Sequence, residues 1–405
     1  FFASMSRLEP FVQWLVGAGL QIQGDGSYFM PNGSSFRLAI ERSIIHDPEA
    51  LPGLVSSFEE VITQPHYLER FLAPCGASGI QHAFSKDSLC RILLNIDGLQ
   101  PHLMRVLLEK VPEYEMEDPS MATKILRQFR WLDVVSNGRA FADKVLEVLA
   151  VVGDELKREF ISLLPNAVDL ESHRRVAAAL LGVARDDSEL LVVCLDALGS
   201  LELDPQTLDH TLELIFSKLP SVKEETLPEI IKFLLQVATG ATAPRILAEL
   251  RTHLPLTEAN KTHRSLKAKG RANAFAQATA LILEALRSGL RFRKDMVGAL
   301  LKELGDQSAV TVVDCLLLIL VYSFGGPTYP RQVEAILHRK VTAGQLDACV
   351  MQQTLALHAD ALADHFGALL SMACLCMRST ANPLSFFGQP MLAAMFGHFR
   401  ANWSQ

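Results

Sequence analysis

Residues 208–219 read LDHTLELIFSKL, and residues 227–235 read LPEIIKFLL. The apolar residues of the first stretch recur at helical spacing, at Leu208, Leu212, Ile215, Phe216 and Leu219. The second stretch repeats the pattern, at Leu227, Ile230, Ile231, Leu234 and Leu235. A period of about 3.6 residues places such side chains on one face of an α-helix. Each stretch therefore predicts a short amphipathic helix.

Similar apolar stripes run through residues 141–152, 246–254 and 281–290, and no stretch shows the sustained alternation of a β-hairpin. Helices of about 10–15 residues with a single apolar stripe cannot bury that stripe alone, so they stack in pairs. No fixed-length repeat is visible in the sequence. The pattern predicts an all-α fold, an irregular α-solenoid of the HEAT or armadillo kind.

Residues at the expected helix ends support this fold. Asp204 precedes Pro205, which is typical of a capping residue followed by proline in the first turn. Ser221 and Glu224 have the spacing of a capping box. Both pairs predict that a helix begins at these positions.

Three stretches interrupt the helical pattern and are expected to be loops. Residues 24–35 are rich in Gly, Asn and Ser, residues 113–120 are acidic, and residues 256–273 are polar and basic. The interruptions suggest three parts: an N-terminal α-solenoid over 1–200, a helical domain with a basic loop over 201–305, and the start of a second α-solenoid over 306–405.

Composition narrows the possible functions. Of the 405 residues, 49% are apolar and only 7% aromatic, which favours a large helical core over a β-sandwich. The net charge of -7 argues against nucleic-acid binding over the whole surface, although a local basic face remains possible. The seven cysteines have mostly apolar neighbours in the sequence. They are expected to be reduced core residues of an intracellular protein.

No membrane segment is expected. The longest apolar run, residues 310–322, contains Thr311 and Asp314 and is shorter than the roughly 18–20 residues that span a bilayer. The sequence shows no signal peptide and does not begin with Met, so it is expected to be a segment of a longer chain.

Candidate catalytic and metal-binding groups are all better explained in other ways. Cys374 and Cys376 point to different sides of a helix, and His358 and His365 are two turns apart, about 10 Å. We expect the cysteines to pack in the core and the histidines, with Asp360 and Asp364, to form a solvated helix face.

Two further groups lack the surroundings that catalysis or cofactor binding requires. Gly24 and Gly26 lack the strand and helix of a dinucleotide loop. Glu113, Glu115, Glu117 and Asp118 have nothing nearby that would raise a pKa, and are expected to form a solvated acidic loop. No cofactor and no enzymatic activity are therefore expected.

A basic cluster is the strongest functional candidate. Five cations lie within eleven residues: Lys261, Arg264, Lys267, Lys269 and Arg271. The cluster is either a solvated loop between domains or a segment that contacts phosphates or an acidic partner. Arg287, Arg291, Arg293 and Lys294 form a second patch, and His338, Arg339 and Lys340 form a weaker third one.

Several short motifs, in order along the chain, resemble the Fanconi anaemia group D-two family. They are LLNIDGLQP at 93–101, VPEY at 111–114, QFRWLD at 128–133, LELDP at 201–205, LPEIIKFLL at 227–235, LKAKGRA at 266–272, LVYS at 320–323 and SFFG at 385–388. None is catalytic, and their specificity comes from their order and spacing.

The resemblance implies the N-terminal portion of a longer helical protein of the nucleus. It implies pairing with the Fanconi anaemia group I paralogue, a clamp around double-stranded DNA, and attachment of one ubiquitin by the Fanconi core ubiquitin ligase. The modified lysine is expected beyond Gln405, so Lys340, in an exposed-looking stretch, is not expected to be the acceptor. A family Ser-Gln phosphorylation site would align near Ser172, but His173 follows here.

Two hypotheses follow. The first is a non-enzymatic scaffold of DNA interstrand crosslink repair that binds the paralogue and, in the complete clamp, DNA. The second is a different helical-repeat adaptor for transport or trafficking. The first predicts salt-sensitive DNA affinity that rises with the partner, whereas the second predicts peptide or lipid binding without that dependence.

Overall fold

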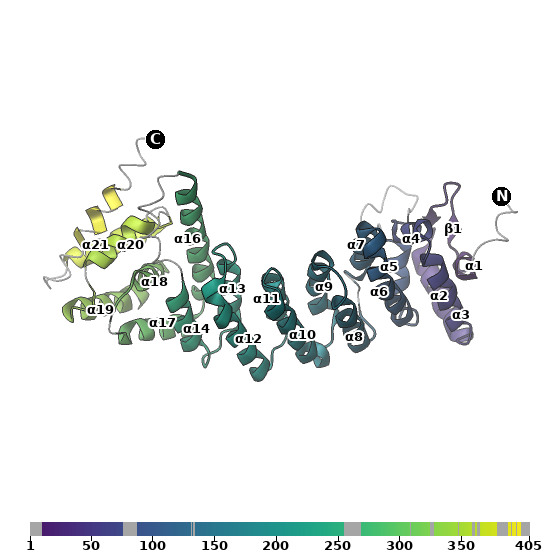
Figure 1. Ribbon diagram of the computed structural model, residues 1–405, viewed down its shortest axis with the longest axis horizontal. Helices are drawn as coiled ribbons and strands as arrows, with labels where there is room; N and C mark the ends of the chain where they lie inside the picture. Colours follow the sequence, from purple (N-terminus) through teal and green to yellow (C-terminus); the bar gives the residue numbers. More distant parts are fainter. Residues whose placement is uncertain are drawn as a thin grey trace. The chain divides into compact units, whose positions relative to one another are not determined.

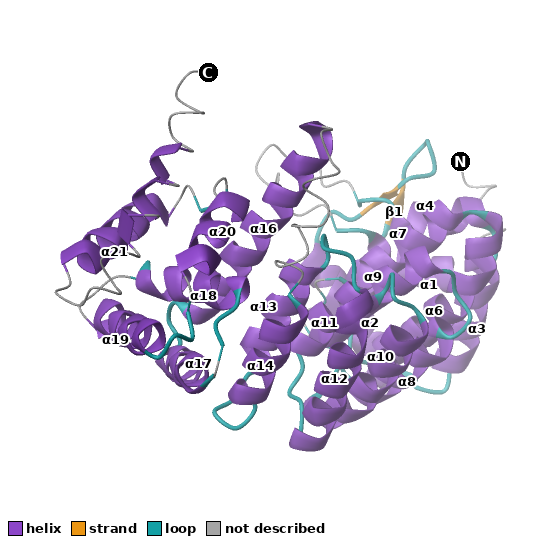
Figure 2. Ribbon diagram, turned by 60° about the vertical axis from the view of Figure 1, so that its left-hand side comes forward, coloured by secondary structure: helices purple, strands orange, loops and turns teal. Residues whose placement is uncertain are grey.

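The computed structural model confirms the expected all-α class. It describes residues 10–75, 87–130, 132, 134–254, 269–307, 309–324, 328–346, 348–358, 361–362, 365–378, 388–389, 391–393 and 395–397. Figure 2 shows helices nearly throughout, with one small pair of strands. Internal contacts divide the chain into two compact units, Phe1–Thr207 and Leu208–Gln405. The three-part division expected from the sequence stays a prediction.

The first unit consists of short helices and one β-hairpin. Its elements are α1 (Pro10–Gly17), β1 (Gln21–Ile22), β2 (Tyr28–Phe29), α2 (Gly33–His46), α3 (Leu51–Ile62), α4 (Pro65–Leu72), α5 (Leu89–Leu94), α6 (Gln100–Glu117), α7 (Pro119–Phe129), α8 (Gly138–Leu149), α9 (Asp154–Ala167), the 3₁₀ turn η2 (Leu170–Ser172), α10 (His173–Asp186) and α11 (Leu191–Gly199).

The second unit begins within α12 (Pro205–Lys218). Its further elements are the 3₁₀ turn η3 (Leu219–Ser221), α13 (Leu227–Val237), α14 (Ala243–His253), α16 (Lys269–Leu290), α17 (Lys294–Asp306), α18 (Val312–Tyr322), α19 (Thr328–Thr342), α20 (Ala348–His358) and α21 (Phe366–Arg378).

Within the first unit, helices pack on their neighbours in the chain. Helices α6, α8 and α10 contact one another in sequence, and so do α7, α9 and α11. Figure 1 shows these as two rows of helices. Each row covers the apolar face of the other, because α6 packs on α7 and α8 packs on α9. This is the side-by-side packing that single-striped helices require.

The N-terminal hairpin corrects the expectation that residues 24–35 form a loop without strands. Strands β1 and β2 pair antiparallel, with Gly26 in the turn at φ 82°, a conformation that glycine adopts without strain. Asn32 then accepts a hydrogen bond from the Ser35 amide and starts α2. The strands are too short to show a two-residue period in the sequence.

The helix starts predicted at residues 204 and 221 had different outcomes. Asp204 accepts hydrogen bonds from the amides of Gln206 and Thr207 at 3.1 and 3.0 Å, so α12 begins as predicted. The capping box at Ser221 was wrong. Ser221 ends η3, and the next helix begins only at Leu227, where Pro228 suits the first turn.

Gln100, in the LLNIDGLQP motif, links two helix connections through its buried amide. Its nitrogen donates to the carbonyls of Leu94 and Val134 at 2.8 and 2.7 Å. Its oxygen accepts from the Ser136 amide and hydroxyl at 2.6 and 2.7 Å. Only 1% of Gln100 is exposed. The side chain therefore joins the end of α5 to the α7–α8 connection and pairs the buried Leu94 carbonyl.

In the second unit, an ion pair holds the start of α18. The Asp314 carboxylate, 2% exposed, accepts from Arg251 of α14, with one N···O distance of 2.8 Å. It also accepts from the Thr311 amide at 2.7 Å, which completes a capping box. Asp314 therefore pairs with a charge and caps a helix, which is why a carboxylate is tolerated within this apolar stretch.

Replacing Gln100 with Leu should destabilise the chain by about 1–3 kcal/mol, because the Leu94 carbonyl would stay buried without its partner and the link to the α7–α8 connection would be lost. The measurement is the urea unfolding midpoint. Gln332→Leu is the control, because Gln332 is exposed on α19 and its replacement should change stability by less than about 0.5 kcal/mol. Equal midpoints for the two variants would contradict the role given to Gln100.

Candidate partner and nucleic-acid interface

The basic cluster lies partly outside the described residues. Lys261, Arg264 and Lys267 fall outside them, whereas the backbone of Lys269 and Arg271 lies in the first turn of α16. The expected loop over 256–273 is therefore wrong for its last five residues. The cause is the alanine-rich sequence after Gly270, since alanine is the strongest helix former and extends α16 backward into the basic segment.

The second basic patch lies where α16 meets α17, and only part of it is free. The Arg293 guanidinium donates to the carbonyls of Leu235 and Ala238 at 3.1 and 2.7 Å, and so pairs groups at the end of α13. Arg287 lies 3.5 Å from Glu284. Arg291 and Lys294 are exposed. The patch therefore contributes two uncommitted cations, fewer than its sequence indicates.

The third patch contains a buried lysine. Lys340 is 2% exposed, and its ammonium donates to the Gln307 carbonyl and, at 3.1 Å, to the Gln345 side chain. Burial lowers the pKa of Lys340. The exposed stretch expected here is therefore wrong for this residue. Lys340 lies on the same helical face as Val333, Ile336 and Leu337, so it points into the core.

The acidic residues 113–117 belong to a helix instead of the expected loop. Helix α6 runs through Glu117, and Asp118 alone separates it from α7. Glu115 accepts from the Gly153 amide at 2.8 Å and so caps the start of α9. A hydrogen bond from Ser120 lowers the pKa of Asp118, the opposite of what a general acid needs at neutral pH.

The histidines expected on a solvated face are buried instead. His358 and His365 are 2% and 7% exposed, and Asp360 and Asp364 lie outside the described residues. The burial of His358 follows from its place on one helical face with Met351, Thr354 and Leu355. Among the described residues, no group of three His, Cys, Asp or Glu side chains could hold a metal ion.

The cysteine pair near the C-terminus belongs to the packing of α21. Cys376 is buried and Cys374 half-buried. Burial raises the pKa of the Cys376 thiol to about 11, which keeps it protonated and unreactive at neutral pH.

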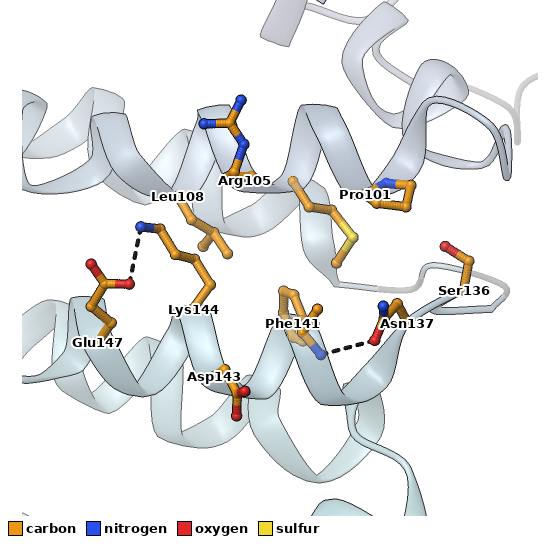
Figure 3. Close-up of a pocket in the computed structure, with 11 residues that line it drawn as sticks. Pro101, Arg105, Leu108, Ser136, Asn137, Phe141, Asp143, Lys144 and Glu147 are labelled. Atoms are coloured by element: carbon orange, nitrogen blue, oxygen red, sulfur yellow. Dashed lines mark hydrogen bonds and ion pairs between the residues drawn. The ribbon is translucent and has the colours of Figure 1, made fainter. Parts of the chain in front are cut away.

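A groove between α6 and α8 was not expected from the sequence. It has a volume of about 340 Å³, and its apolar lining includes Met104, Leu108 and Phe141. Lys144 also lines the groove, and its ammonium lies 3.1 Å from Glu147 (Figure 3). It lies 3.0 Å from Glu109 as well. Among the eleven lining residues, the Ser136 hydroxyl donates to Gln100 and the Lys144 ammonium is paired with Glu109 and Glu147, so no hydroxyl of the lining is hydrogen-bonded to a general base.

Comparison with known proteins identifies the family. A family model described as "Fanconi anaemia protein FancD2 nuclease" matches residues 36–405. The chain belongs to this FancD2 family. It is 27% identical over 390 residues to the Fanconi anemia group D2 protein of Gallus gallus, which covers 90% of this chain and 27% of that protein. The Mus musculus homolog is 27% identical over 377 residues, or 87% of this chain and 26% of that protein.

The match confirms the resemblance seen in the sequence motifs and sets its extent. The chain spans about a quarter of the length of these FancD2 relatives. The family description contains the word nuclease. Within the described ranges, no helix is long and apolar enough to cross a membrane.

The buried position of Lys340 can be tested by chemical modification. Limited acetylation of the native chain at pH 8 should modify Lys340 roughly ten-fold or more slowly than Lys302, which is exposed on α17, because the buried amine reacts only when the structure opens locally. Mass spectrometry of each site gives the rates. In denaturing urea the two rates should converge. Equal rates in the native chain would show that Lys340 is exposed.

Proposed function

We propose that this chain is a non-enzymatic scaffold of DNA interstrand crosslink repair in the nucleus. It binds the Fanconi anaemia group I paralogue and, within the complete clamp, double-stranded DNA. We also propose that the full-length protein is monoubiquitinated by the Fanconi core ligase at a lysine beyond this segment. The observation that carries the proposal is the family match over residues 36–405.

The described fold is compatible with a scaffold. Short helices packed in rows expose helix faces and connecting turns, which are the binding surfaces of helical-repeat proteins. The described side chains present no metal-binding group, and the groove beside α8 has no nucleophile–base pair. We therefore propose binding as the role of this segment and place no nuclease site within its described residues.

The basic cluster is the segment that we assign to binding of DNA or of the paralogue. The LKAKGRA motif within it resembles the family, and the backbone of Lys269 and Arg271 lies in the first turn of α16. The N-terminus of a helix carries partial positive charge from its unpaired amides. Cationic side chains at this position therefore add to a field that already attracts phosphates or carboxylates.

Charge reversal of Lys267, Lys269 and Arg271 to Glu should weaken capture of the group I paralogue. If the cluster contacts DNA in the assembled pair, the slope of log affinity against log salt should also fall by roughly three, because each lost phosphate contact removes about one unit. The first measurement is a pull-down with the purified paralogue. The second is a DNA titration of the assembled pair at several salt concentrations.

The matched control reverses three exposed cations on separate helices, Arg158, Lys232 and Lys302. It changes the net charge by the same amount without touching the cluster. Equal losses in both variants would show a general charge effect and contradict the role of the cluster. If neither this segment nor the full-length protein captures the paralogue, the trafficking-adaptor hypothesis should replace the repair scaffold.

The non-enzymatic part of the proposal has its own test. Incubation of the chain with labelled duplex and single-stranded DNA in Mg²⁺ or Mn²⁺ should leave both intact, because metal-dependent hydrolysis needs clustered ligands for the ion. Gel electrophoresis reads the result. Cleavage that co-elutes with the chain through size-exclusion chromatography would contradict the proposal and support the nuclease wording of the family description.

A further inference from the structure

The turn between α16 and α17 displays an aromatic side chain to solvent. Helix α16 ends at Leu290 and α17 starts at Lys294, and Phe292 between them is 84% exposed. Phe396, another exposed phenylalanine, is 58% exposed. A single exposed apolar residue needs no special explanation. What distinguishes Phe292 is the structure around it.

First, the turn is anchored to the rest of the second unit. Arg293 donates to the carbonyls of Leu235 and Ala238, and its guanidinium also lies 3.2 Å from Asp295. The Arg293 amide donates to the Leu290 carbonyl at 3.0 Å. Phe292 therefore projects from a fixed backbone, so little conformational entropy would be lost when the ring inserts into a partner.

Second, two uncommitted cations flank Phe292 along the chain. The Arg291 guanidinium lies 5.5 Å from the centroid of the Phe292 ring, as in a cation–π contact. Arg291 and Lys294 are both exposed, and neither forms an ion pair with another residue in the described part of the chain. The turn thus combines one protruding apolar ring with two free cations.

Third, this combination matches a known mode of DNA binding. Proteins that deform the duplex insert an apolar side chain between base pairs, while neighbouring Arg or Lys residues contact the phosphates. The ring supplies the stacking surface, and Arg291 and Lys294 supply the charge. A protein with an apolar pocket and acidic residues at its edge is the alternative occupant. The two differ in one measurable respect, because only insertion into DNA unstacks bases.

We infer that Phe292 is a wedge that inserts between base pairs of double-stranded DNA, with Arg291 and Lys294 on the flanking phosphates. This inference rests on the proposed function, because it requires that the assembled complex binds DNA. It adds a DNA-contacting site that is separate in sequence from the basic cluster. It also adds a mode of contact that deforms the duplex.

The test uses the full-length protein with its group I paralogue and a duplex that carries 2-aminopurine, whose fluorescence rises when a base unstacks. The wild-type complex should raise the fluorescence. Phe292→Ala should abolish the rise and weaken binding by roughly ten-fold, the loss of one stacking contact. It should leave the salt dependence unchanged, because no charge is removed. Phe292→Trp should restore the rise, and Phe396→Ala serves as the matched control.

The outcomes separate the wedge from the proposed function. If wild type binds DNA without a rise in fluorescence, or if Phe292→Ala keeps the rise, the wedge is overturned and the DNA-binding scaffold stands. If Phe292→Ala lowers capture of the paralogue while the fluorescence rise persists, Phe292 packs against protein and the wedge is likewise overturned. If the wild-type complex binds no DNA, the proposed function fails and the wedge fails with it.

Discussion

The fold depends on the fact that short helices with one apolar stripe need neighbours to cover it. The contact between α13 and α16 shows how closely they approach. A Cβ atom on Gly289 of α16 would overlap the side chain of Leu235 on α13, so the small residue is required by the packing. Close-packed faces of this kind leave little room for polar groups. Many of the polar side chains with structural roles are therefore found at helix ends and connections.

Polar contacts of this kind explain the structural role of several family motifs. Tyr114 of the VPEY motif donates to the Ile62 carbonyl at 2.6 Å, and Gln128 of the QFRWLD motif accepts from the Ser88 hydroxyl at 2.5 Å. Gln100 and Asp204, in two other motifs, pair backbone groups. Each of these contacts joins two elements or starts a helix. These motifs therefore carry the fold, and the functional residues are expected on the surface.

The periodic stripes correctly predicted five helices, α8, α12, α13, α14 and α16, because apolar periodicity follows directly from burial on one face. Loops were harder to predict from composition. Residues 113–117 are acidic yet helical, because an amphipathic helix has a polar face that looks like a loop when read alone. Lys340 could have been placed in the core from its spacing with Val333 and Ile336. The role of Arg293 could not, because its carbonyl partners are 58 and 55 residues away.

Several basic residues that the sequence offers for binding have structural roles instead. Arg251 pairs with Asp314, Arg293 pairs carbonyls of α13, and Lys340 bonds the Gln307 carbonyl in the core. These cations stabilise the fold and are not available to an anionic partner. In a chain of net charge -7, an anionic partner would be attracted where a few exposed cations lie close together. Among the described residues, the turn after α16 meets that requirement through the exposed side chains of Arg291 and Lys294.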